Sequence, residues 1–200
     1  MKIALIGTHC TGKTGLVAQT YGWFIRNGKS VNIIKEMSEN PPTRLPINEE
    51  TTLAAQRAIL FFQMGYESAL SNYHDHLISD RGTIDNWMYL QRVREKIVRE
   101  GVPISFAEEK ILGPLEDLSI AWSSTYDYQF VLSPGRYKIE QNRIRSIDPV
   151  FQGEINDSLT KYIDEHTFPG DIYSLSSARD YFDQVKETIR RDYPEEFKID

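Results

Sequence analysis

Residues that could bind phosphate gather within the first fourteen positions of the chain. Gly7 and Gly12, followed by Lys13 and Thr14, fit the spacing G-x-x-x-x-G-K-[ST] of a phosphate-binding loop. Glycines lack a Cβ atom, so the backbone can approach phosphate oxygens closely, and successive N–H groups can point inward as an anion-binding nest. We therefore predict that a nucleotide binds to the loop residues Gly7, Thr8, His9, Cys10, Thr11, Gly12, Lys13 and Thr14.

Two further features of the motif indicate phosphoryl chemistry with a metal ion. Lys13 would reach the β- and γ-phosphate oxygens of ATP, and the Thr14 hydroxyl would bind Mg²⁺. Asp80 follows the apolar run "HLIS" and has the form of a carboxylate that holds Mg²⁺ directly or through water. An Asp that only caps the following helix is the alternative. ATP and Mg²⁺ are the expected cofactors, with Thr14 and Asp80 as the metal ligands.

The elements that must position these residues alternate between strands and helices. The apolar, β-rich run Lys2–Ile6 predicts a buried strand, and residues 13–27 have a helical composition that ends before Gly28. The same patterns predict further strands at residues 30–36, 76–79, 128–132 and 170–176, and further helices at residues 48–73, 83–99, 105–122, 149–165 and 178–191. This alternation indicates an α/β fold with a parallel sheet covered by helices on both faces.

Ligands bind beyond the carboxyl ends of the strands in an open parallel sheet. The expected strand ends carry Gly7, Glu36, Asp80 and Ser133, and three of these four are candidates for the site. Arg81, beside Asp80, could bind an anionic or hydroxyl-bearing acceptor, and a structural ion pair is the alternative. The sequence therefore predicts a nucleotide site with an acceptor next to it.

Length, charge and cysteine content limit the class of protein. The 200 residues suit one domain spanning residues 1–200, and the net charge of −6 argues against a nucleic-acid-binding surface. One cysteine permits no internal disulfide, and no apolar run reaches the roughly 20 residues that span a bilayer. We expect a reduced, cytoplasmic protein with neither a nucleic acid nor a membrane as partner. Its oligomeric state stays open, a homodimer included.

Several segments together resemble the P-loop nucleoside and nucleotide kinases. They are "GTHCTGKT", a Glu closing the second strand, "FFQ" in the next helix, "ISDRGTIDNWMYL", and an Arg-bearing segment before the penultimate helix. The pattern is similar to deoxynucleoside kinases, thymidylate kinase-like enzymes and bacterial ribosylnicotinamide kinase domains. The resemblance implies a three-layer P-loop NTPase fold with a five-stranded parallel sheet and a mobile lid at about residues 134–148. It also implies ATP-dependent phosphoryl transfer to a small-molecule acceptor.

The resemblance also implies roles on the acceptor side. Glu36 would accept or orient the proton of the acceptor hydroxyl, and Arg81 would hold the acceptor near the transferring group. Gln63 matches the glutamine that contacts a base edge in deoxynucleoside kinases, and Asp85 matches a carboxylate near the sugar or base. An aromatic residue from the helix after Asp80 could line the same pocket.

Three arginines and one difference from the deoxynucleoside kinase pattern leave the class of acceptor undecided. Arg143 and Arg145 would be lid residues that neutralise charge in the transition state. Deoxynucleoside kinases usually carry Glu-Arg-Ser where this chain has Asp80, Arg81 and Gly82. Arg44 in the proline-rich segment would suit a monophosphate acceptor. The acceptor could thus be a nucleoside, a nucleoside monophosphate or a nucleoside-like molecule.

Other NTP-binding classes remain as alternatives or are disfavoured. An ATPase that serves as a regulatory or partner-dependent switch would share the phosphate loop. A small GTPase should carry Asn-Lys-x-Asp after a late strand, whereas "PGRYKIEQNR" follows "QFVLS" here. A large ring ATPase would need a further helical domain, and a polynucleotide kinase would need a basic groove. Transfer to a small acceptor is therefore the favoured hypothesis.

Overall fold

The computed structural model describes residues 1–38, 45–46, 50–135, 149–168 and 170–200. Its strands are β1 Lys2–Ile6, β2 Val31–Ile34, β3 His76–Asp80, β4 Tyr128–Leu132 and β5 Ile172–Leu175. Its helices are α1 Lys13–Arg26, α2 Leu53–Leu70, α3 Thr83–Arg99, α4 Phe106–Ser123, α5 Pro149–Glu165 and α6 Tyr181–Asp192. The predicted α/β class with a five-stranded parallel sheet is confirmed.

The order of the strands, β2-β3-β1-β4-β5, places β1 at the centre of the sheet. Leu5 of β1 lies opposite Asp80 of β3 on one side and opposite Phe130 of β4 on the other. Because all five strands run parallel, the loop after β1 and the end of β3 meet at the same edge. The register thus brings the phosphate loop and Asp80 together.

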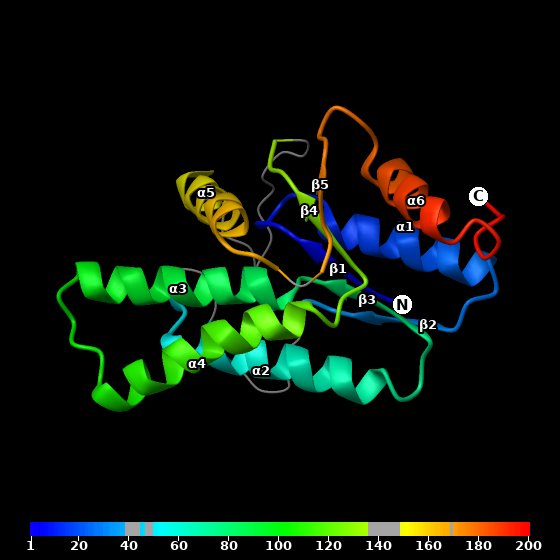
Figure 1. Cartoon of the computed structure of the whole chain (residues 1–200). Coiled ribbons are helices and arrows are strands. Elements are labelled where there is room, and N and C mark those ends of the chain that lie inside the picture. Colours follow the sequence, from blue (N-terminus) through cyan, green and yellow to red (C-terminus); the bar gives the residue numbers. More distant parts are fainter. Residues whose placement is uncertain (39–44, 47–49, 136–148, 169) are drawn as a thin grey trace.

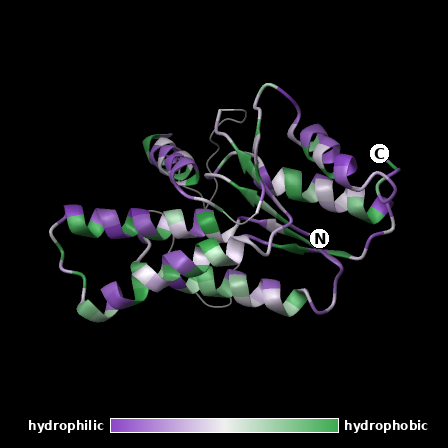
Figure 2. Cartoon of the chain, viewed as in Figure 1, coloured by the Kyte–Doolittle hydropathy of each residue, from purple (hydrophilic) through white to green (hydrophobic). Residues whose placement is uncertain are grey.

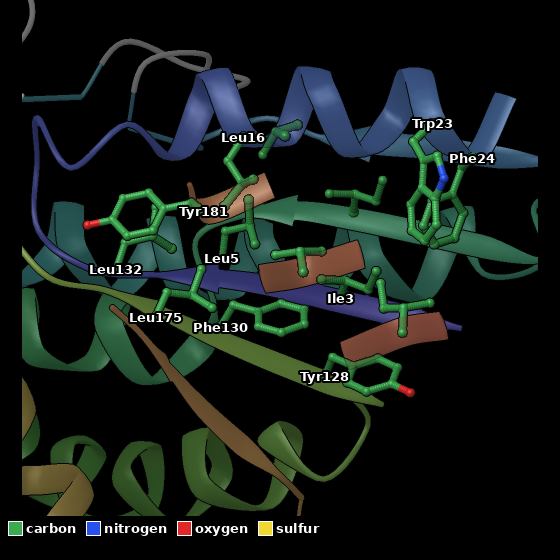
Figure 3. Packing of buried hydrophobic residues seen from close by; sticks show 14 of the residues in the cluster. Ile3, Leu5, Leu16, Trp23, Phe24, Tyr128, Phe130, Leu132, Leu175 and Tyr181 are labelled. Carbon is green, nitrogen blue, oxygen red and sulfur yellow. The ribbon is translucent and has the colours of Figure 1, made fainter. Parts of the chain in front are cut away.

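The sheet is covered by helices on both faces, as Figure 1 shows. Helices α1 and α6 lie on one face, where Ile3 and Leu5 of β1 enter a core with the large aromatic side chains of Trp23 and Phe24 (Figure 3). Phe197, after α6, is also buried there. This core anchors α1, whose first turn forms the end of the phosphate loop.

The opposite face packs against α2, α3 and α4, and α5 lies against α3 (Figure 1). Ala4 and Ile6 of β1 point to this side and meet side chains such as Ile84 and Trp87 of α3. Figure 2 shows green strands at the centre, while α3 and α6 alternate between purple and green residues. Such a pattern is expected for strands buried on both faces beneath amphipathic helices. Among the described helices, none has the length and hydropathy of a membrane span.

Several predicted element bounds differ from the structure, among them the end of β2 and the starts of α2 and α6. β2 ends at Ile34, so Glu36 lies in the segment after the strand rather than within it. α2 begins at Leu53, where the Thr52 hydroxyl accepts a hydrogen bond from Ala55 N at 3.1 Å. α6 begins at Tyr181 because the Asp180 carboxylate caps it. Residues 136–148 of the predicted lid lie outside the described residues.

Candidate functional site

The phosphate loop has the backbone conformation that its glycines predict. Gly7 has a φ of 145°, and a Cβ atom there would lie 2.7 Å from the carbonyl oxygen of Leu132. Gly12, at the start of α1, has a φ of 92°. Residues other than glycine rarely adopt these φ angles. At Gly7 there is also no room for a Cβ atom. Cys10 also has a positive φ, 57°, at the bend of the loop.

Lys13 folds back over the loop and is buried. Its Nζ atom donates hydrogen bonds to the carbonyl oxygens of Gly7 at 2.8 Å and Thr8 at 2.5 Å. Burial, with a contribution from the positive charge of Arg81, lowers the pKa of Lys13 from 10.5 to about 8. The ammonium group is therefore inside the loop, next to the N–H groups that would hold phosphates.

The lowered pKa of Lys13 predicts a pH dependence of nucleotide capture. A base whose pKa is about 8 loses its charge as the pH rises through 8, whereas an ordinary lysine stays charged to about 10.5. We expect kcat/KM for ATP to fall above about pH 8, because this ratio reports the free enzyme. Bound phosphates favour the charged lysine, so kcat should fall only at higher pH. A kcat/KM profile that stays flat to pH 10 would contradict this role of Lys13.

Thr14 and Asp80 are in contact, as the metal-site hypothesis requires. The Thr14 hydroxyl donates to Asp80 Oδ2 at 2.7 Å. Asp80 Oδ1 is buried and has no hydrogen-bond partner among the described residues, and burial raises the pKa of this carboxyl. Asp80 is not the N-cap of α3, because that position belongs to Gly82.

A hydroxyl beside a partly unsatisfied carboxylate fits Mg²⁺, which takes few protein ligands and completes its shell with phosphates and water. In the described part of the chain, no cluster of three or more His, Cys, Asp and Glu side chains is placed to hold a metal ion. Thr14 and Asp80 are thus the groups that would hold the cation. When bound, the cation would offset charge on the phosphate oxygens.

Replacing Asp80 by Asn should raise the Mg²⁺ concentration needed for half-maximal activity, by about tenfold or more, because a neutral amide is a poorer ligand for a hard cation. The measurement is a Mg²⁺ titration of turnover at fixed ATP. Asp75→Asn, an exposed change at the other end of β3, is the matched control. Superimposable titrations of D80N and the wild type would remove Asp80 from the metal site.

Glu36 and Arg81 form a buried ion pair beside the loop. Glu36 Oε1 accepts hydrogen bonds from Arg81 Nε and from the Ser38 hydroxyl, each at 2.6 Å. Although burial alone would raise the pKa of Glu36, the charges of Arg81 and Lys13 and these hydrogen bonds lower it to about 2. A carboxylate with so low a pKa is a weak base. It is better suited to orienting an acceptor hydroxyl than to removing its proton.

A small cavity of about 80 Å³ links Glu36 to the phosphate loop. Residues 9–15 line it together with Glu36. Arg81 lies alongside, since its Nη1 atom is 3.3 Å from the carbonyl oxygen of Gly7. The two acceptor-side residues predicted from the resemblance therefore adjoin the loop.

Arg81 has a strained backbone. Its φ of 98° lies in the region that favours glycine, and holding another residue there costs of order 1–3 kcal/mol. Next to it, a Cβ atom on Gly82 would lie 3.3 Å from Ala4 Cβ and Ile6 Cγ1. A side chain at position 82 would therefore press against β1, which favours glycine there.

Asp85 is fully buried and holds the loop. Its Oδ2 atom accepts from Gly7 N at 3.2 Å and lies 3.3 Å from Arg81 Nη1, and its Oδ1 atom accepts from Gly82 N at 3.0 Å. Burial outweighs the charge of Arg81 and raises the pKa of Asp85 to about 6. Both oxygens thus have partners within the protein, so the geometry favours a loop-fixing role over the predicted contact with an acceptor.

Gln63 is also fully buried, between α2 and β3, and its amide nitrogen lies within hydrogen-bonding distance of protein groups. It does not line the described cavities next to the loop. Arg44, Arg143 and Arg145, the other predicted acceptor and lid residues, lie outside the described residues. Their roles stay predictions.

The start of α5 supplies contacts with the loop that the sequence did not reveal. The Phe151 ring stacks on His9 with centroids 5.8 Å apart, and Gln152 Nε2 donates to the carbonyl oxygen of His9 at 2.6 Å. Phe151 also meets Tyr89 edge-to-face at 6.2 Å, and Arg81 Cζ lies 4.6 Å from the Tyr89 ring centroid. These aromatic residues connect α5, α3 and the loop.

A larger cavity of about 320 Å³ lies between α3 and α5. Tyr89 and Phe151 line it, together with the basic side chains of Arg92, Lys96 and Arg99. Because Tyr89 contacts Arg81 and Phe151 contacts His9, the cavity lies next to Arg81 and next to the phosphate loop. An aromatic residue in the helix after Asp80 was predicted, whereas helical periodicity gave no signal for Phe151 and Gln152.

Comparisons with known proteins identify a family and a similar fold. Residues 2–174 match the model of a protein family described as an AAA domain. No curated protein matches the chain in sequence. Two solved structures of deoxyadenosine kinase from M. mycoides are similar in fold. One, with bound dCTP, has a TM-score of 0.55 at 16% identity and covers 97% of this chain and 100% of its own. The other, with the products dCMP and a flexible dCDP bound, has a TM-score of 0.58 at 15% identity and covers 97% and 99%.

Proposed function

The chain belongs to the AAA domain family and has the fold of a P-loop nucleoside kinase, and from this premise we propose that it is an ATP-dependent phosphotransferase. Its acceptor would be a nucleoside, a nucleoside monophosphate or a nucleoside-like small molecule, and Mg²⁺ would be its cofactor. The proposal extends to a cytoplasmic location and to partners that are small molecules rather than nucleic acid or membrane.

One observation carries this proposal: the Glu36–Arg81 pair adjoins the phosphate loop. Glu36 lines the same small cavity as Lys13 and Thr14, and Arg81 reaches the carbonyl oxygen of Gly7. Hydrolysis of ATP needs only water as the acceptor. A buried arginine and an ionised carboxylate held beside the loop suit an acceptor that must be oriented, which favours transfer over hydrolysis.

Each residue then has a defined task. The loop amides and Lys13 would hold the β- and γ-phosphates, and Thr14 and Asp80 would hold the cation. Glu36, ionised through the neutral pH range, would accept a hydrogen bond from the acceptor hydroxyl. Arg81 would stabilise negative charge on the group in transfer. Arg143 and Arg145, if they reach the site, would add to that stabilisation.

The larger cavity between α3 and α5 is the proposed place of the acceptor. Its volume of about 320 Å³ lies in the range typical of small-molecule sites. Tyr89 and Phe151 offer aromatic surface for a planar base. Since Tyr89 packs under Arg81, an acceptor beside Tyr89 would have its reacting end near the loop.

A coupled assay of ADP release tests the proposal. Nucleosides and nucleoside monophosphates are supplied singly with Mg-ATP, and an acceptor-free sample is run beside them. We expect turnover that depends on one class of acceptor, with the phosphorylated product identified by mass spectrometry. Equal ADP release without any acceptor would overturn the transferase proposal and favour an ATPase that acts as a switch.

A further inference from the structure

Gln63 contacts the backbone carbonyl of Arg81, whereas the ion pair with Glu36 uses the Arg81 guanidinium. Its Nε2 atom lies 2.6 Å from Glu67 Oε1, 2.5 Å from Ser79 Oγ and 3.3 Å from the carbonyl oxygen of Arg81. These groups belong to α2, to β3 and to Arg81, the residue that follows β3. Gln63 therefore links the middle of α2 to the backbone of the strained residue.

The chemistry of its neighbours fixes the orientation of the Gln63 amide. A carboxylate and a peptide carbonyl can only accept, so the amide must present its NH₂ group to Glu67 and Arg81. If the amide were turned over, its oxygen would face two acceptors. In the present orientation, Gln63 Oε1 is buried without a hydrogen-bond partner among the described residues. The two NH₂ hydrogens thus face Glu67, Ser79 and the carbonyl oxygen of Arg81, of which the Arg81 oxygen is the most distant.

Glu67 in turn is held rigidly by several donors. Its Oε1 atom accepts from the Tyr126 hydroxyl at 2.8 Å, and its Oε2 atom accepts from Trp122 Nε1 at 2.7 Å and pairs with Lys2 Nζ at 2.5 Å. The carboxylate is fully buried. A buried carboxylate needs such partners, and this set comes from β1 and from the end of α4 and the turn after it. The anchor of Gln63 is therefore built from the sheet and from α4.

We propose that Gln63, oriented by Glu67, is a positioning residue that holds Arg81 in its strained conformation and so keeps the Arg81 guanidinium between Glu36 and the phosphate loop. The backbone of Arg81 is fixed at both polar groups: its N–H donates to Leu5 O at 3.1 Å, and its carbonyl oxygen accepts from Gln63. The bond to Leu5 continues the β-sheet. The bond from Gln63 comes from a helix and acts at the carbonyl that follows the positive φ of 98°.

This inference separates Gln63 from direct contact with an acceptor. The side chain has no exposed surface, so an acceptor would meet it only after a rearrangement of the core. In the proposed role, Gln63 acts through Arg81. The effect of Gln63 on catalysis rests on the proposed function. Its effect on the backbone conformation of Arg81 does not.

A thermal-unfolding cycle tests the structural content without any activity. At a positive φ, Arg81→Gly relieves strain that Arg81→Ala retains, and both remove the same guanidinium contacts. With Gln63 present, we expect the Gly variant to unfold at a temperature at least about 2 °C higher than the Ala variant. In a Gln63→Met background, the conformation of Arg81 is no longer held. The difference in unfolding temperature between the Gly and Ala variants, called the Gly-minus-Ala gap, should then shrink by half or more. An unchanged gap would overturn the proposal.

A second variant covers the case in which Gln63→Met does not fold. Glu67→Gln keeps the size of the side chain but removes the charge that orients Gln63, and the same Gly-minus-Ala gap is measured in that background. A gap that shrinks supports the proposal, and an unchanged gap overturns it.

A kinetic arm then tests the link to catalysis. Gln63→Met should lower kcat at least about tenfold with little change in the KM for ATP. Tyr126→Phe is the control, because it removes a buried hydrogen bond to the same Glu67 oxygen and leaves Gln63 intact. If both variants lose kcat equally, the network is merely structural and the positioning role is overturned. If the wild type itself transfers to no acceptor, the proposed function fails, and the unfolding cycle alone decides the role of Gln63.

Discussion

Replacing Lys13 by Ala is expected to lower phosphoryl transfer by about 10²- to 10³-fold, the usual cost of removing one group that stabilises charge in the transition state. The buried ammonium donates to the loop carbonyls of Gly7 and Thr8 and adjoins the small cavity of the site. Its removal takes away positive charge where the phosphates would lie. The measurement is the single-turnover rate of transfer at saturating Mg-ATP.

Stability should not account for this loss of activity. Burial lowers the pKa of Lys13, which means that the fold disfavours its charge. K13A should therefore unfold at or above the temperature of the wild type. Lys161→Ala, on the exposed surface of α5, is the matched control for loss of a cation. A folded K13A that transfers at the full rate would refute the phosphate-loop assignment.

Replacing Glu36 by Gln should reveal the class of acceptor. If the acceptor is a nucleoside, the neutral hydroxyl loses a carboxylate that orients its proton, and kcat should fall by about 10²- to 10⁴-fold. Gln can still accept a hydrogen bond from Arg81, so the ATP affinity should change little. If the acceptor is a monophosphate, its nucleophile already carries negative charge, and the loss should be much smaller. The measurement is kcat for each acceptor class with E36Q and the wild type.

Arg44→Ala completes that comparison. A monophosphate acceptor would lose a charged partner, so its KM should rise while kcat stays near the wild-type value. Lys161→Ala, which also removes one positive charge, is the control for R44A, and Glu95→Gln, an exposed carboxylate change on α3, is the control for E36Q. If E36Q and R44A both behave as the wild type with every accepted substrate, neither residue belongs to the active site.

Much of the nucleotide half of the site could be predicted because its parts are close in the sequence. Gly7, Gly12, Lys13 and Thr14 lie on one strand–loop–helix unit, and the positive φ values at the two glycines are properties of single residues. Asp80 required one further step, the rule that parallel strands end at a common edge. The pairing of Leu5 with Asp80 and the bond from Thr14 to Asp80 bear out that rule.

The acceptor half depended on contacts between residues that are distant in the sequence. The sequence placed Glu36 and Arg81 at the same edge of the sheet, but their ion pair depends on β2 lying next to β3. The pKa of about 2 at Glu36 results from the charges of Arg81 and Lys13. Helical periodicity marks which side of α5 is apolar. It does not state that Phe151 and Gln152 meet the loop at His9. That contact follows from the packing of α5 against α3.

The sequence by itself determined the class of fold, the phosphate loop and the approach of Thr14 to Asp80, because short-range backbone preferences and the common edge of parallel strands specify them. Only the tertiary structure decided which partners the buried polar residues have. Asp85 and Gln63 carry the side chains expected of acceptor-binding residues, yet the Asp85 carboxylate is directed to Gly7 and Gly82. The Gln63 NH₂ group is directed to Glu67 and the backbone of Arg81. The physical reason is burial: a polar group removed from water must find a partner in the protein, and the fold determines which one is within reach.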